Sequence, residues 1–187
     1  MTGEVLIVDN GSRSTPLIGD LVRQAGWHTS VVAAALAVPV PRSADAVILT
    51  GTDLPVFAPG YEAEIGLIRD CAVPLLGICG GMQLIGRAYG VGLDKGEAVI
   101  GATPVRLRWG VDLFDGLPQE AQLFQRHVYR LRSTPPGFEV TASSESCAIE
   151  GIRQAGRPLY GMQAHLEFRH HGRQILRRFL QIARERA

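Results

Sequence analysis

Short runs of mainly apolar residues divide the first half of the chain into alternating elements. Four of these runs are predicted to be strands: residues 5–8, 29–34, 46–49 and 73–78. Between them, apolar residues recur at helical spacing in three segments: residues 17–24, residues 61–71 and the stretch after Cys79 that ends near Tyr89. Strands that alternate with helices in this way indicate a parallel sheet with helices on both faces, the doubly wound arrangement.

The second half of the chain has a different pattern, in which short strand candidates are separated by turn residues. These candidates are residues 99–109, 122–124, 138–142, 148–152 and 159–162. A last helix is predicted over about residues 172–186, with apolar residues on one face. No linker or composition break is present, so we expect one domain over residues 1–187. The predicted fold class is α/β: a mostly parallel, doubly wound sheet flanked by helices, with short antiparallel strands in the second half.

Composition excludes several classes of protein. Of the 187 residues, 46% are hydrophobic and 20% are charged, which is typical of a globular chain that is soluble in water. The net charge of +1 gives no reason to expect a nucleic-acid or membrane partner. Three irregularly spaced cysteines predict neither a disulfide framework nor a zinc site, and no signal peptide or membrane-length apolar run is present. We therefore expect a cytoplasmic protein without a metal or a cofactor.

The most informative segment joins the fourth predicted strand to the helix after it. Here an apolar run ends in Gly77-x-Cys79-x-Gly81, the pattern of a nucleophile elbow. Small residues on both sides let the backbone pass through a strained turn and leave room for a substrate. Cys79 then precedes a helix N-terminus, which favours thiolate over thiol. The pattern predicts a reactive cysteine.

A reactive thiol needs a base and a group that orients this base. The five candidate bases are His28, His127, His165, His170 and His171. His165 directly follows the predicted strand 159–162, at the edge where doubly wound sheets place their sites. In extended backbone, Glu167 would point the same way as His165. The residues thus predict a Cys79–His165–Glu167 triad, although such an i, i+2 pair also arises by chance; His28, His170 and His171 are expected to be structural or solvated.

Together, Gly77-x-Cys79-x-Gly81-x-Gln83 and His165-x-Glu167 resemble the class I, triad-type glutamine amidotransferases. The similarity covers nearly the whole chain and is greatest to the separate amidotransferase subunit of GMP synthetase, on residues 7–11, 74–79, 126–127, 136–138, 144–150 and 159–163. It implies a flavodoxin-like fold and a glutaminase reaction, in which Cys79 attacks the side-chain amide of glutamine and ammonia and glutamate are released.

The resemblance also implies further site residues. The oxyanion hole would be formed by backbone N–H groups of Gly80 and of the Gly51-Thr52 loop. The substrate would be held by Gln83 and by the segment His127, Val128 and Tyr129. Considered alone, Gln83 has the less favoured alternative of an ordinary polar residue of a helix, and His127 is as well explained by a surface loop.

Three positions depart from the family pattern. Gly51-Thr52-Asp53 replaces a Gly-Gly-Pro or Gly-Pro loop, and a positive φ at Thr52 would strain this β-branched residue. Leu166 replaces the proline between the histidine and the glutamate. Val128-Tyr129-Arg130 replaces smaller polar residues. We expect either another loop shape until a partner binds or weak activity of the isolated chain.

The partner implied by the resemblance is a separate ATP-dependent synthetase or synthase chain that receives ammonia, for GMP synthesis by amination of xanthosine monophosphate. Two other hypotheses remain. The same triad suits an autonomous hydrolase or transferase that acts on another γ-glutamyl compound, and the fold would also suit a non-catalytic regulatory subunit. The presence of Cys79, His165 and Glu167 together disfavours the last hypothesis.

Overall fold

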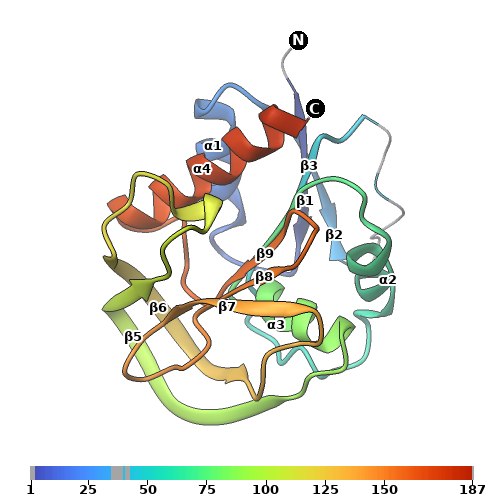
Figure 1. The fold of residues 1–187 in the computed structure, drawn as a ribbon. Coiled ribbons are helices and arrows are strands. Elements are labelled where there is room, and N and C mark those ends of the chain that lie inside the picture. The colour runs from blue at the N-terminus through green and yellow to red at the C-terminus, as the bar shows by residue number, and fades with distance from the viewer. Residues whose placement is uncertain (1–2, 35–39, 41–42, 187) are drawn as a thin grey trace.

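The central sheet has a parallel half and an antiparallel half (Figure 1). The computed structural model describes residues 3–34, 40 and 43–186, and within them nine strands form one sheet in the order β2-β1-β3-β4-β9-β8-β7-β5-β6. The parallel strands are β2 (His28–Ala33), β1 (Glu4–Asp9), β3 (Ala46–Leu49), β4 (Leu75–Ile78) and β9 (Leu159–Met162). Antiparallel pairing joins β8 (Gly151–Gln154), β7 (Phe138–Ser143), β5 (Leu93–Leu107) and β6 (Glu120–Leu131).

Helices cover both faces of the parallel half (Figure 1). Within the described residues, the α-helices are α1 (Thr15–Gln24), α2 (Glu62–Asp70), α3 (Gly80–Ala88) and α4 (His170–Arg186), and a short 3-10 helix, η2 (Asp112–Phe114), follows β5. Alternate residues of β1 show which helix lies on which face. Val5 and Ile7 pack with apolar residues of α1 and α4, whereas Leu6 and Val8 pack with those of α2 and α3. Two hydrophobic cores therefore enclose the sheet and leave the carboxyl ends of its strands for a site.

The predicted α/β fold class is confirmed, and the first four strands lie within two residues of their predicted bounds. Two strands of the second half are longer than predicted. The candidate at 99–109 belongs to β5, which starts at Leu93, and the candidate at 122–124 is the middle of the 12-residue strand β6. The candidate at 148–152 was placed too early, since β8 starts at Gly151. None of the helices in the described ranges has the length and apolar character that a membrane span requires.

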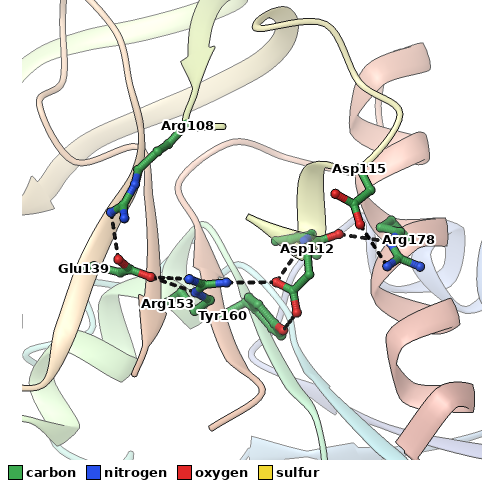
Figure 2. A network of polar contacts seen from close by, with 8 residues as sticks. Arg108, Asp112, Asp115, Glu139, Arg153, Tyr160 and Arg178 are labelled. Atoms are coloured by element: carbon green, nitrogen blue, oxygen red, sulfur yellow. Dashed lines mark hydrogen bonds and ion pairs between the residues drawn. The ribbon is translucent and has the colours of Figure 1, made fainter. Parts of the chain in front are cut away.

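A row of polar contacts ties the antiparallel half to α4 (Figure 2). Arg153 on β8 donates to Glu139 on β7 at 2.8 Å and lies 3.3 Å from Asp112 of η2. Asp112 also accepts a hydrogen bond from the Tyr160 hydroxyl at 2.7 Å, and its backbone oxygen accepts one from Arg178 of α4 at 2.9 Å. Single ion pairs at partly exposed positions contribute little to stability. Together, however, these contacts form a connected network that holds η2 against α4.

Candidate active site

Cys79 occupies the sharp turn between β4 and α3. Its φ of 51° and ψ of −106° lie in a region that residues with side chains seldom adopt. The backbone N–H of Cys79 donates to the Met162 oxygen at 2.8 Å, which ties the turn to β9. Such strain persists only where the surrounding structure imposes it, and it is concentrated at functional sites. The strained strand-to-helix turn expected from the sequence is present, with Cys79 next to the unpaired N–H groups of the first turn of α3.

The loop after β3 approaches this turn closely because two residues lack side chains. A Cβ atom on Gly80 would lie 2.8 Å from the backbone nitrogen of Thr52. A Cβ atom on Gly51 would lie 3.4 Å from Cε1 of His165 and 3.6 Å from Cβ of Cys79. The loop therefore lies close to both the nucleophile candidate and the base candidate. Thr52 is not among the described residues with positive φ, so the strain considered for it is not present.

His165 and Glu167 form the pair that the sequence predicted. Nδ1 of His165 lies 2.8 Å from Oε1 of Glu167, and the backbone N–H of His165 donates to Phe124 on β6 at 2.8 Å. The two residues meet across a turn at residues 166–167, not along extended backbone as expected. Burial disfavours a charged ring, but hydrogen bonds with Cys79 and Glu167 outweigh burial and raise the pKa of His165 above its ordinary value.

Ser14 is a site residue that the sequence analysis did not identify. Its residue type and its place before α1 are those of an N-cap, yet its side chain makes no capping hydrogen bond. The Ser14 hydroxyl instead donates to the same Glu167 oxygen that contacts His165, and it lies 2.9 Å from the hydroxyl of Ser12. Glu167 is fully buried. Ser14 therefore helps to fix the carboxylate that orients His165.

A cavity of about 270 Å³ opens in front of Cys79, and we call it the Cys79 pocket. Its lining residues come from the loop after β3, the elbow and the β5–β6 ribbon: Thr52, Asp53, Leu54, Pro55, Cys79, Gly80, Gln83, Ala98, Ile100, Arg126, His127, Val128 and Tyr129. All of the residues named for substrate binding and for the oxyanion hole line this pocket except Gly51. The structure thus gathers Cys79, Gly80 and Thr52 and the residues predicted to bind substrate around one cavity, which His165 and Glu167 do not line.

Gln83 and His127 face this cavity in different ways. Nε2 of Gln83 donates to the Tyr129 oxygen at 2.8 Å and to Oε1 of Gln163 at 3.2 Å, so its nitrogen is used within the protein. His127 lies on β6 and is 8% exposed, not in a surface loop. Burial lowers the pKa of His127 to about 4 despite a hydrogen bond with the Tyr129 backbone. Its Nε2 has no partner in the described part of the chain, so a neutral ring presents one unused nitrogen.

A second cavity of about 300 Å³ lies on the other side of the loop, and we call it the His165 pocket. Its lining is Ser12, Arg13, Ser14, Leu17, Thr52, Asp53, Phe124, Arg126, His165 and Phe168. Thr52, Asp53 and Arg126 line both cavities. The candidate base is therefore reached from one side and the candidate nucleophile from the other.

A buried polar cluster supports the loop from behind. The Asn10 side chain donates to the Thr50 oxygen at 3.0 Å and to Oε1 of Glu64 at 3.1 Å, and the Thr50 hydroxyl accepts from the Asn10 backbone at 3.0 Å. Glu64 is fully buried, and no partner for its second oxygen is found among the described residues. Burial outweighs the Asn10 hydrogen bond and raises the pKa of Glu64 from 4.5 to about 7.

This cluster predicts a dependence of stability on pH. Between pH 5 and pH 8 the folded state binds more protons at Glu64 than the unfolded state does, so the free energy of unfolding falls as pH rises. The shift corresponds to a loss of roughly 2 to 3 kcal/mol over that interval. In Glu64→Gln this loss should be absent, as measured by urea unfolding at both pH values. Glu62→Gln, an exposed position of α2, is the control and should keep the wild-type pH dependence; parallel curves for Glu64→Gln and wild type would contradict the prediction.

Residues 6–183 match the sequence family described as "Glutamine amidotransferase class-I". Among curated proteins, the chain is 35% identical over 183 residues to "GMP synthase [glutamine-hydrolyzing]" of Parafrankia sp., covering 95% of this chain and 34% of the relative. It is 28% identical over 186 residues to a protein of Pyrococcus abyssi that is named as one subunit of "GMP synthase [glutamine-hydrolyzing]". This match covers 97% of this chain and 99% of the relative. The chain therefore spans about a third of the length of the first relative and nearly all of the second.

Solved structures give the same picture of the fold. A crystal structure described as a putative GMP synthase subunit from Thermoplasma acidophilum superposes with a TM-score of 0.91 at 28% identity, covering 100% of this chain and 96% of that chain. A glutamine amidotransferase from Thermotoga maritima superposes with a TM-score of 0.80 at 20% identity, covering 100% of this chain and 84% of that chain. The second similarity concerns the fold alone.

Proposed function

Because the chain belongs to the class I glutamine amidotransferase family, we propose that it hydrolyses the side-chain amide of glutamine through a Cys79–His165–Glu167 triad. The observation that carries the proposal is the position of Cys79. Its strained turn places it beside the His165–Glu167 pair and at the wall of a cavity of about 270 Å³. A cavity of that size is large enough for one small amino acid.

In this mechanism, the Cys79 thiolate attacks the side-chain carbonyl carbon of glutamine, and the negative charge moves to the carbonyl oxygen. The backbone N–H groups of Gly80 and Thr52 would stabilise this oxyanion, and the two residues lie close together, since a Cβ atom on Gly80 would lie 2.8 Å from the Thr52 nitrogen. His165 gives its proton to the nitrogen as the C–N bond breaks and ammonia leaves. It then takes a proton from water, which attacks the thioester and releases glutamate. Glu167, held by Ser14, keeps the His165 ring in position.

The substrate would enter the Cys79 pocket from solvent. His127, Val128 and Tyr129 line the pocket, and the backbone of Val128 and Tyr129 would contact the amino-acid end of glutamine. Gln83 holds this wall through the Tyr129 oxygen. Gln83 would then act on the substrate through the position of β6 and through the oxygen of its own side-chain amide.

We further propose that the ammonia is used by a separate ATP-dependent synthetase chain in GMP synthesis. The support is that the Pyrococcus abyssi relative is named as one subunit of its enzyme and matches this chain over 99% of its length. The Cys79 pocket has a rim of exposed apolar side chains: Leu54, Ile100 and Val128 line the pocket and are 67%, 74% and 38% exposed, and Phe57, 60% exposed, packs on the Tyr129 ring. Exposed apolar groups that gather at one site are typical of an interaction surface. This rim is the surface proposed to meet the synthetase.

The test is release of glutamate from glutamine by the purified chain, alone and with a synthetase subunit from the same organism. A second readout is mass spectrometry after treatment with a glutamine analogue that carries an electrophilic ketone, which should label Cys79 and neither Cys71 nor Cys147. Glutamate release that rises with the synthetase supports the whole proposal. Failure to release glutamate while the synthetase is bound would favour a regulatory subunit. Labelling by a different γ-glutamyl compound but not by glutamine analogues would favour an autonomous hydrolase.

A further inference from the structure

Gln163 is a buried polar residue in direct contact with the sulfur of Cys79. It follows β9 immediately, is fully buried, and its backbone N–H donates to the Glu150 oxygen at 2.8 Å. Its side-chain nitrogen lies 3.6 Å from Sγ of Cys79, within the range of an N–H···S hydrogen bond. The mechanism proposed for glutamine hydrolysis does not use this contact.

The orientation of the Gln163 amide is fixed by a chain of hydrogen bonds that begins on β6. The Tyr129 backbone oxygen can only accept, so it must face the nitrogen of Gln83, 2.8 Å away. That nitrogen can only donate, so the group of Gln163 that faces it at 3.2 Å must be Oε1. The remaining group, Nε2, is then the one that faces Cys79. The assignment of nitrogen and oxygen in Gln163 follows from the network.

We propose that Gln163 is a positioning residue that holds the sulfur of Cys79 by donating a hydrogen bond to it, and that Tyr129 sets this donor through Gln83. This rests on the proposed function and adds a residue to it. A donor to sulfur stabilises the thiolate more than the thiol. Cys79 would thus be held from two sides, by His165 and by Gln163. Because Tyr129 lines the substrate pocket, a substrate that moves β6 would also adjust the nucleophile.

The electrostatic surroundings of Cys79 come from several elements. His165 follows β9, His127 and Arg126 lie on β6, and Asp53 lies in the loop after β3. Substitution of Gln163 by another uncharged residue leaves all of these groups in place. A change in the pH dependence of Cys79 reactivity would then report on the lost donor.

The test compares Gln163→Met with wild type by the rate of Cys79 alkylation with iodoacetamide from pH 5 to pH 10. Peptide mass spectrometry follows Cys79 separately from Cys71 and Cys147, which are buried. Methionine has nearly the length of glutamine but no N–H, so the pH of half-maximal alkylation should rise by about one unit. If the wild type hydrolyses glutamine, kcat should fall about 10- to 100-fold with little change in KM. An unchanged alkylation profile in a folded Gln163→Met would overturn the proposal.

Gln125→Met is the matched control. Gln125 is also a fully buried glutamine, but its nitrogen donates to Glu150 at 2.8 Å and not to Cys79. This variant should lose stability as Gln163→Met does and should keep the wild-type alkylation profile. A shift of equal size in Gln125→Met would overturn the proposal, because it would show a general effect of loosened packing.

Gln83→Met provides an independent route if Gln163→Met does not fold. It removes the donor that fixes the Gln163 amide, so the alkylation midpoint should shift in the same direction, and an unchanged midpoint would overturn the proposal. Alkylation needs no glutamine, so failure of glutamine hydrolysis in the wild type would reject the proposed function and leave this test intact.

Discussion

Cys79→Ala should abolish glutamine hydrolysis, with kcat lowered by about 10⁴- to 10⁶-fold relative to wild type. The proposed reaction passes through a thioester on Cys79, and alanine offers no atom to form it. His165 and the backbone N–H groups would remain, but without the sulfur no covalent bond to the substrate carbon forms, so they have no intermediate to stabilise. The fold should be retained, because alanine at a φ of 51° carries the same backbone strain as cysteine. Glutamate release by saturating enzyme is the measurement.

Cys71→Ala is the control for this prediction. Cys71 is also free and buried, but it follows α2 and does not line the Cys79 pocket. Its variant should retain kcat within about threefold of wild type. Cys79→Ala with more than a few per cent of wild-type activity would show that another group is the nucleophile.

Phe179→Ala should lower the free energy of unfolding by about 3 to 5 kcal/mol. Phe179 lies on α4, is fully buried, and packs edge-to-face on Tyr160 of β9 with ring centroids 6.3 Å apart. Truncation leaves a cavity between α4 and the sheet at its centre, where the surrounding strands cannot collapse into it. Urea unfolding followed by circular dichroism gives the value.

Phe57→Ala removes the same side chain from the surface and serves as the comparison. Phe57 is 60% exposed and contacts the Tyr129 ring at a centroid distance of 5.5 Å. Its loss should cost less than about 1 kcal/mol. A loss below about 1 kcal/mol in Phe179→Ala as well would mean that α4 is not held to the sheet by this contact.

The strands of the parallel half were predicted well because strands that are buried on both faces appear in the sequence as apolar runs. Residues 5–8 and 46–49 are buried on both faces, so each strand is an unbroken apolar run. The hydrophobic pattern of β6 is weaker. Its inward positions alternate regularly, but two of them, Gln125 and His127, are polar because they face the site and the buried Glu150. These two polar residues at inward positions thus interrupted the apolar pattern by which the strand would have been predicted.

The sequence likewise predicted some residues of the candidate site and not others. Cys79, His165 and Glu167 stand next to strand ends, so their positions could be inferred from short patterns. The contacts of Ser14 with Glu167 and of Gln163 with Cys79 join residues 153 and 84 positions apart, and no local pattern indicates them. Residues next to a strand end are indicated by local patterns, whereas these two contacts appear only in the folded structure.

The Cys79 pocket has walls of two origins. Its floor belongs to the parallel half through the elbow and the loop after β3, and its opposite wall belongs to the β5–β6 ribbon through Ala98, Ile100 and residues 126–129. The ribbon is one continuous stretch of chain, residues 93–131, and all members of the proposed triad lie outside it. A chimera that carries this stretch from a relative would exchange the substrate-facing wall while keeping the chemistry. The residues proposed for recognition and the proposed triad are therefore encoded in different segments of one chain, joined by the hydrogen bonds of Gln83 with Tyr129 and of His165 with Phe124.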